Sequence, residues 1–152
     1  MTYRRILVPV DGSPTSNLGL REAIRLAKGQ RAGLQLVHVV DQHYLLMNSA
    51  EIGINIERLL PALKQAGRRI LRRAEALAGR HGVKCSSALL ETFAGPAAEP
   101  IVRQAKKWRA DLIVLGTHGR RGARRLLMGS DAEQIVRNSP VPVMLVRSKE
   151  RR

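Results

Sequence analysis

The sequence has few of the residues that several common classes of protein depend on. It contains a single cysteine, Cys85, which excludes an internal disulfide and fits a reducing compartment. Aromatic residues make up only 3% of the chain, so the core has to be aliphatic. No stretch approaches the roughly 18 apolar residues of a membrane span, and the N-terminus lacks the apolar segment of a signal peptide. We therefore expect a cytoplasmic protein with no membrane partner.

Acidic residues are also scarce. The 152 residues include 27 Lys and Arg but only 12 Asp and Glu, which gives a formal net charge of +15. An excess of this size favours polyanions such as nucleotides, nucleic acid or acidic membrane surfaces. The basic residues form separate clusters, most of which fall where a helix surface would face solvent. The length suits one domain, which we expect to span residues 1–152.

Strand patterns alternate with helix patterns along the whole chain. Short apolar runs rich in β-branched residues predict five strands, and apolar residues at helical spacing predict four helices between them. The strands are expected at 4–10, 34–40, 83–91, 111–116 and 141–147, and the helices at 14–29, 55–80, 98–110 and 130–138. This alternation is typical of an α/β sandwich with a parallel sheet.

Capping residues support several of these boundaries. Ser13 before Pro14 has the pattern of an N-cap followed by proline at the first helical position. Gly29 and Gly33 bracket the expected end of this helix. Pro100 is tolerated only in a first turn, so the third helix is expected to start at 98–100.

Two strand ends carry unusual residues. One is "VPVDGS" after the first strand, and the other is "GTHGRRGARRLLMGSD", residues 116–131, after the fourth. Ligands of open α/β sheets bind outside the carboxyl ends of strands, where the strand order reverses. Placing the first and fourth strands side by side joins the two ends into one crevice and gives the strand order 3-2-1-4-5.

The second of these segments has the features of an anion-binding loop. Its glycines let backbone amides approach an anion, and Gly129-Ser130 opens a helix whose first amides are free. Across the crevice, Asp11 either accepts from ribose hydroxyls or from a metal-bound water, or completes a turn with Gly12. The segment is neither a Walker A loop nor the GxGxxG dinucleotide fingerprint.

At this point the sequence resembles the universal stress protein family over nearly its whole length. The most specific part is G-x2-G-x9-G-[S/T], and "ILVPVDGS", "LVHVV", "ADLIVLGTHGR" and "SPVPVMLV" also look like that family. The resemblance implies a Rossmann-like, three-layer α/β sandwich of the adenine nucleotide alpha hydrolase type, with a five-stranded parallel sheet of order 3-2-1-4-5. It also implies an ATP-binding regulatory module in the stress response, with slow or no ATP hydrolysis, and commonly a homodimer.

The resemblance assigns binding roles by position and no catalytic residue. The backbone of Val39 would face adenine next to Pro9. Asp11 and Gly116 would lie by the ribose. Mg²⁺ would be held through the phosphates and not by a protein site. The phosphates themselves would be held by Gly119, Arg120, Gly129 and Ser130.

Asp131 departs from the family pattern, which usually has a small apolar residue or threonine after Gly-Ser. Its carboxylate would repel the phosphates, hold Mg²⁺ through a water, or favour the positive end of its own helix. We favour repulsion, because the family manages without a carboxylate at this position.

The expected partners follow from the last strand and from the charge. A bare apolar edge strand is a liability, so Val143 and Leu145 predict a homodimer through antiparallel pairing of the last strand. The alternative to ATP binding is a nucleic-acid or acidic-partner binding protein with a vestigial nucleotide loop. The charge favours that alternative, but the scarcity of aromatic residues weakens its single-strand version.

Other reactive side chains are given structural readings. His38 lies in an expected buried strand and is interpreted as a core histidine with a hydrogen-bond partner. Cys85 is interpreted as a small core or half-buried residue and not as a reactive thiol. No spacing of His and Cys suggests a metal site. His118 is interpreted as a solvated or phosphate-neighbouring side chain and not as a catalytic acid or base.

Overall fold

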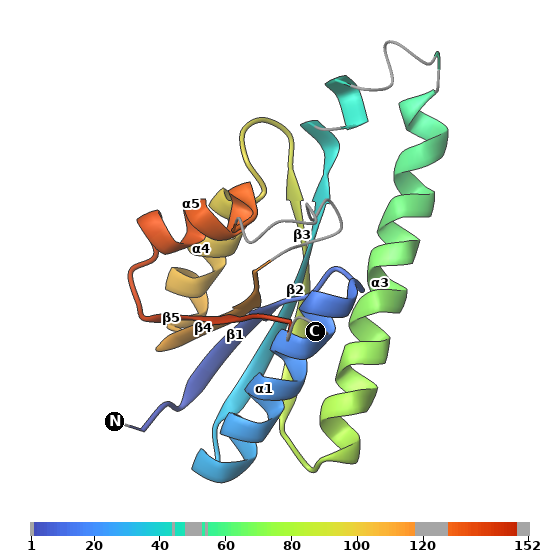
Figure 1. The fold of residues 1–152 in the computed structure, drawn as a ribbon. Helices are drawn as coiled ribbons and strands as arrows, with labels where there is room; N and C mark the ends of the chain where they lie inside the picture. Colours follow the sequence, from blue (N-terminus) through green and yellow to red (C-terminus); the bar gives the residue numbers. More distant parts are fainter. Residues whose placement is uncertain (1, 44, 48–52, 54, 118–127, 149–152) are drawn as a thin grey trace.

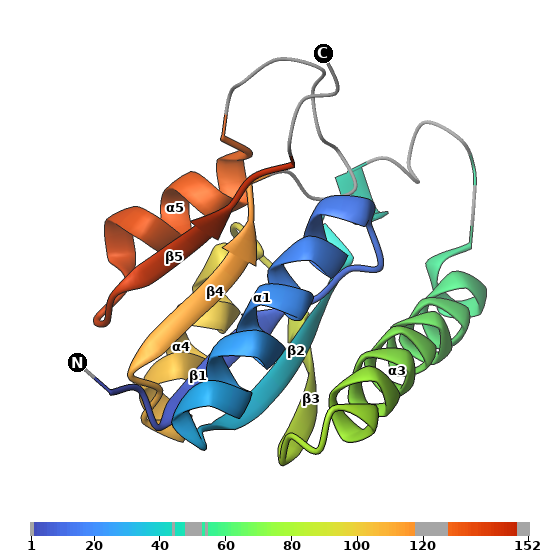
Figure 2. The ribbon, with the colours of Figure 1, turned by 60° about the horizontal axis from the view of Figure 1, so that its bottom comes forward.

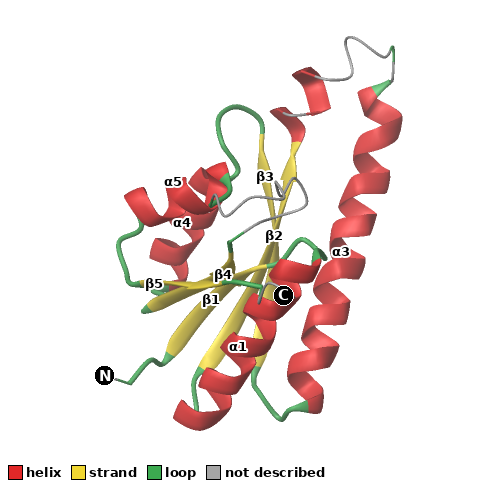
Figure 3. Ribbon diagram, viewed as in Figure 1, coloured by secondary structure: helices red, strands yellow, loops and turns green. Residues whose placement is uncertain are grey.

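The computed structural model describes residues 2–43, 45–47, 53, 55–117 and 128–148 (Figure 1). Its strands alternate with its helices along the chain, as Figure 3 shows by colour. The strands are β1 (Arg5–Pro9), β2 (Gly33–Asp41), β3 (Cys85–Thr92), β4 (Leu112–Gly116) and β5 (Val143–Val146). The helices are α1 (Pro14–Gln30), α3 (Ile56–Arg80), α4 (Ala98–Trp108) and α5 (Ser130–Asn138). Each expected element is therefore confirmed, with boundaries that differ by two residues at most.

The strands form one parallel sheet in the order β3-β2-β1-β4-β5, which confirms the order expected from the sequence. β1 lies between β2 and β4, so the chain reverses its direction of winding there. β5 lies at one edge and pairs with β4 from Ile113↔Val143 to Gly116↔Val146. The fold is the Rossmann-like α/β sandwich that the sequence predicts.

Two helices cover each face of the sheet (Figure 2). Because successive strand residues point to opposite faces, each strand supplies apolar side chains to two separate cores. Ile6 and Val8 of β1 belong to the core under α1 and α3. Leu7 belongs to the core under α4 and α5. Both cores are almost entirely aliphatic, as the scarcity of aromatic residues requires.

The start of α1 is the one that the sequence predicts. The Ser13 hydroxyl accepts a hydrogen bond from the Ser16 amide at 3.2 Å, and Pro14 occupies the first turn. α1 ends at Gln30, between Gly29 and Gly33 as expected, and its left-handed cap residue is Arg31, with φ of 55°. The Ala32 amide donates to the Ala27 carbonyl at 2.9 Å, and this hydrogen bond closes the helix around Arg31.

Pro100 lies in the first turn of α4, which begins at Ala98 as expected. None of the described helices is long and apolar enough to cross a membrane.

Candidate functional site

The carboxyl ends of β1 and β4 lie side by side at the centre of the sheet. The two strands pair directly through Ile6↔Leu112 and Leu7↔Ile113. The turn that follows β1 and the segment that follows β4 therefore start from neighbouring positions at the carboxyl-terminal end of the sheet. This arrangement confirms that the two unusual sequence segments begin side by side, at the point where the strand order reverses.

The turn after β1 fixes the orientation of Asp11. One carboxylate oxygen, Oδ1, accepts a hydrogen bond from the Ser13 amide at 2.8 Å. The Asp11 amide in turn donates to the Ser16 hydroxyl oxygen at 3.1 Å. Gly12 between them has φ of 80°, a left-handed conformation that favours glycine. The turn expected for Asp11 and Gly12 is therefore present. It fixes the orientation of the Asp11 carboxylate just before the N-terminal end of α1.

His38 of β2 holds the backbone that leads into this turn. Its side chain is only 9% exposed, and its Nδ1 lies 2.8 Å from the carbonyl oxygen of Val10. A carbonyl only accepts hydrogen bonds, so we assign the ring proton to Nδ1. The interpretation of His38 as a core histidine with a partner is confirmed. Its hydrogen bond holds the backbone immediately before Asp11.

Gly116 has a packing role that needs no ligand. A Cβ at this position would lie 2.5 Å from the backbone oxygen of Thr15 in the first turn of α1. One turn further along α1, a Cβ on Gly19 would lie 3.0 Å from the Gly116 nitrogen. The two glycines thus allow α1 to approach the end of β4 closely. The resemblance places Gly116 by a ribose but does not predict its contact with Thr15 and Gly19. The sequence signal for this contact is Gly19, a glycine within the apolar stripe of α1.

Gly129, in contrast, has a backbone conformation that does not require glycine, and the described residues around it leave room for a Cβ. It is the N-cap of α5 with φ of −58° and ψ of 152°, which any residue can adopt. The nearest atom to a Cβ there would be the Thr117 oxygen at 3.4 Å, an ordinary van der Waals distance. The Gly129 amide donates to this oxygen at 2.8 Å, so the start of α5 is tied to the end of β4. No side chain of the N-cap residue caps the first amides of α5.

Val39 brings backbone groups to the same carboxyl-terminal end of the sheet. The last residue pair between β1 and β2 is Pro9↔Val37, and the Val10 amide still donates to the Val37 carbonyl at 2.8 Å. Backbone groups alternate between the two sides of a strand, so those of Val39 point to the side of Val37, past the end of β1. The side chain of Val39 packs against the core that contains Ala132 of α5. Val39 and the start of α5 therefore share one face of the sheet.

Ser130 and Asp131 are both exposed in the first turn of α5. A carboxylate there interacts favourably with the positive end of the helix. Gly119 and Arg120, and also His118, lie outside the described residues. Among the described residues, no group of three or more His, Cys, Asp or Glu side chains could hold a metal ion.

Cys85 is half-buried at the start of β3. Burial raises the pKa of its thiol, and the nearby Glu75 carboxylate raises it further. A higher pKa leaves less of the nucleophilic thiolate at neutral pH. The interpretation of Cys85 as a half-buried residue without a reactive role therefore agrees with its surroundings.

Solved structures with the same fold include nucleotide complexes. The hypothetical protein MJ0577 superposes with a TM-score of 0.85 at 24% identity, over 99% of this chain and all of the other. A universal stress protein in complex with cAMP has a TM-score of 0.67 at 22% identity, over 96% and 98% of the two chains. The dAMP complex of the universal stress protein from Archaeoglobus fulgidus has a TM-score of 0.66 at 23% identity, over 95% and 98%. These likenesses establish the fold.

Sequence comparison establishes the family. The universal stress protein MJ0531 of Methanocaldococcus jannaschii is 36% identical over 149 residues, which are 98% of this chain and 85% of that protein. The model of the universal stress protein family matches residues 2–147. With its strand order, its paired strand ends and this match over nearly its whole length, the chain belongs to the universal stress protein family.

Proposed function

We propose that this protein binds ATP at the carboxyl ends of β1 and β4 and acts as a nucleotide-dependent regulatory module in the stress response, with slow or no hydrolysis. The observation that carries the proposal is the glycine at position 129. Neither the backbone conformation nor the packing of the described residues around it needs a glycine. A side chain at an N-cap commonly accepts hydrogen bonds from the first amides of its helix, and the glycine leaves the amides of α5 without such a cap. Such amides at a helix N-terminus are suited to a phosphate group.

The phosphates are assigned to the segment between β4 and α5. Gly129 and the first amides of α5 hold one phosphate group, and the Ser130 hydroxyl donates to its oxygens. The spacing G-x2-G-x9-G-[S/T] adds Gly119 and Arg120 to this phosphate site. The solved cAMP and dAMP complexes of other universal stress proteins support a nucleotide at this fold, and ATP is our proposal for this chain.

The adenosine is assigned to the ends of β1 and β2. The backbone groups of Val39 point past the end of β1, where they can recognise the edge of adenine, with Pro9 beside it. Asp11 accepts from the ribose hydroxyls, since its carboxylate is already oriented by the Ser13 amide. Gly116 lies by the ribose in this assignment, and it also packs against α1.

Mg²⁺ belongs with the phosphates in this proposal. Mg²⁺ commonly keeps several waters and is bound through substrate phosphates with one or two carboxylates. When bound, the ion would neutralise part of the phosphate charge.

We also propose that residues 1–152 act as one domain and that two copies form a homodimer through β5. β5 pairs with β4 on one side and is the edge of the described sheet. Leu145 is 37% exposed there, and Val143 is partly buried. Antiparallel pairing with the same strand of a second copy would cover this edge by two-fold symmetry.

The test is to identify and titrate the nucleotide. We expect mass spectrometry of the supernatant of denatured, freshly purified protein to detect ATP, and calorimetry of nucleotide-free protein to give a saturable heat with Mg-ATP. A wild-type protein that gives no heat with millimolar ATP, with or without Mg²⁺, would overturn the proposal.

A further inference from the structure

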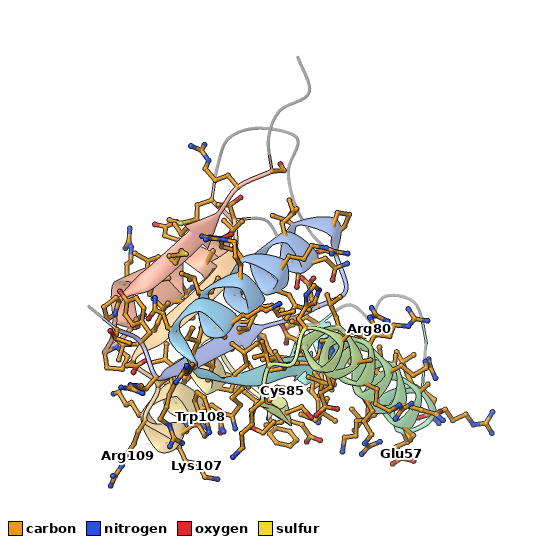
Figure 4. The ribbon with its side chains drawn as sticks, turned by 90° about the horizontal axis from the view of Figure 1, so that it is seen from below. Glu57, Arg80, Cys85, Lys107, Trp108 and Arg109 are labelled. Atoms are coloured by element: carbon orange, nitrogen blue, oxygen red, sulfur yellow. The ribbon has the colours of Figure 1, made fainter. Side chains whose placement is uncertain are left out.

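The positive charge is concentrated on one face of the molecule. α1, with its cap residue Arg31, and α3 together carry eleven basic and three acidic residues, a net charge of +8. α4, with its cap residue Arg109, and α5 on the other face carry five basic and three acidic residues, a net charge of +2. Figure 4 shows Arg80 of α3 far from Lys107 and Arg109 at the end of α4. More than half of the formal charge of +15 therefore belongs to one layer.

Four arginines follow one another on the exposed side of α3. Arg68, Arg69, Arg72 and Arg73 are all exposed, and none of them forms an ion pair with a described residue. They make two like-charged i,i+4 pairs, with the members of each pair about 6 Å apart along the helix axis. Like charges at this spacing destabilise a helix. No contact within the described chain offsets that repulsion.

A basic groove extends the same surface toward α1. It has a volume of about 430 Å³ and lies between the C-terminal half of α1 and the residue that follows α3. Glu22 pairs with Arg25 at its side and neutralises part of the charge. Its lining consists of Arg21, Ile24, Arg25, Lys28, Gly29 and His81. We call this groove and the exposed basic residues of α1 and α3 the α1–α3 face.

We propose that the α1–α3 face binds the phosphate backbone of double-stranded nucleic acid without reading its sequence. Arginine matches phosphate oxygens through two parallel hydrogen bonds, and contacts to phosphates position a protein without specifying bases. Neither α1 nor α3 contains an aromatic residue, so the face lacks the stacking surfaces by which proteins hold single strands. This surface is separate from the ATP site, because it uses the exposed sides of α1 and α3 and not the carboxyl ends of the strands.

The composition of the face favours a duplex over an anionic membrane. Helices that lie on membranes bury an apolar side in the lipid interface. The apolar residues of α3, such as Leu71, Ala74 and Ala78, are buried against the sheet instead. No large hydrophobic side chain is exposed among the described residues of α3, and in α1 only Leu18 is, at 39%. A single exposed leucine is ordinary on a protein surface, so the two helices offer charge without a continuous apolar side for a membrane.

The experiment measures fluorescence anisotropy of a labelled DNA duplex of about 20 base pairs as salt rises from about 50 to 200 mM. One variant carries Arg68→Gln, Arg69→Gln, Arg72→Gln and Arg73→Gln. The matched control removes the same charge from the other face with Arg103→Gln, Lys106→Gln, Lys107→Gln and Arg137→Gln. Glutamine has a helix propensity close to that of lysine and arginine, so both variants should fold, and circular dichroism and Mg-ATP titration check this.

We expect wild-type protein to bind the duplex at low salt, equally well for a scrambled sequence. The α3 variant should bind at least tenfold more weakly, with a log–log salt slope shallower by up to about 3.6, because each phosphate contact contributes about 0.9. The control should lose less than threefold. Equal losses in both variants, or a wild type that does not bind the duplex at low salt, would overturn the proposal. Tighter binding to phosphatidylserine vesicles than to the duplex, lost in the α3 variant, would instead assign the face to a membrane.

Discussion

Gly67 of α3 lies directly over the imidazole ring of His38 in β2. A Cβ at Gly67 would come within 2.7 Å of His38 Cδ2 and 2.8 Å of Leu89 Cδ1. The ring cannot move aside freely, because its Nδ1 is hydrogen-bonded to the Val10 carbonyl at 2.8 Å. The glycine therefore sets how closely α3 packs on the sheet, and the same ring holds the backbone that leads into Asp11.

Gly67→Ala should destabilise the protein although alanine is the better helix former. Overpacking of this kind costs about 1–3 kcal/mol, more than the roughly 1 kcal/mol gained in helix propensity. Gly79→Ala is the matched control in the same helix, because its added Cβ would meet no described atom within 4 Å beyond its chain neighbours and the local helix backbone. It should stabilise by about 0.5–1 kcal/mol. Urea unfolding measures both, and a stabilising Gly67→Ala would show that the contact with His38 is unimportant.

The Cys85 thiol should react slowly with iodoacetamide at about pH 8, close to the ordinary pKa of cysteine. Burial and Glu75 both raise the pKa of this thiol, so less thiolate is present at that pH than in a free cysteine. Glu75→Gln removes the carboxylate, lowers the pKa and should speed alkylation several-fold. Glu57→Gln, at the far end of α3 from Cys85 in Figure 4, should leave the rate unchanged. Equal rates for both variants would argue against an effect of Glu75.

Leu145→Glu should convert a dimer into a monomer. The substitution places a charge on the exposed edge strand, where two-fold pairing would bring the two carboxylates close together. Val136→Glu on α5 is the control, because Val136 is 42% exposed and lies off the edge strand. Sedimentation velocity at tens of micromolar should show a dimer for wild type and the control, and a monomer for Leu145→Glu. A monomeric wild type would exclude the dimer.

Asp131→Asn and Asp131→Val should both tighten ATP binding about tenfold, equivalent to roughly 1.4 kcal/mol, with or without Mg²⁺. A carboxylate about 6 Å from a phosphate charge costs roughly 3 kcal/mol at an effective dielectric of 20, and both variants remove it. The loss of a favourable charge at the start of α5 should lower the stability of the free protein by about 0.3–1 kcal/mol. Weaker binding confined to the titrations with Mg²⁺ would show instead that Asp131 serves the metal ion.

The elements and their order could be predicted because their signals are local. Each strand is a short apolar run, each helix has an apolar stripe, and the alternation leaves few ways to arrange a parallel sheet. The left-handed caps Arg31 and Arg109, with φ of 55° and 56°, could not be predicted. Arginine has no preference for that conformation. The hydrogen bonds from the Ala32 and Ala110 amides to the Ala27 and Ala105 carbonyls close the two helices around these caps.

The resemblance assigns roles to the positions of the candidate site, but it cannot separate a glycine that the packing requires from one that it does not. Glycines in a loop read alike in the sequence, although Gly116 is needed for packing on Thr15 and Gly129 is not needed by the fold. The difference depends on which atoms an added Cβ would meet. For Gly116 those atoms belong to Thr15 of α1, about 100 residues away in the chain. The contact of Gly67 with His38 is hidden for the same reason.

Gly129→Ser distinguishes a glycine that serves a bound nucleotide from one that serves the fold. Serine is a good N-cap, so the free energy of unfolding should stay within about 0.5 kcal/mol of wild type. Its hydroxyl would occupy the first amides of α5, so calorimetry should show ATP binding weakened at least tenfold. Gly116→Ala, in contrast, should destabilise by about 1–3 kcal/mol, because its Cβ would meet the Thr15 backbone. ATP binding to folded Gly129→Ser as tight as to wild type would contradict the account.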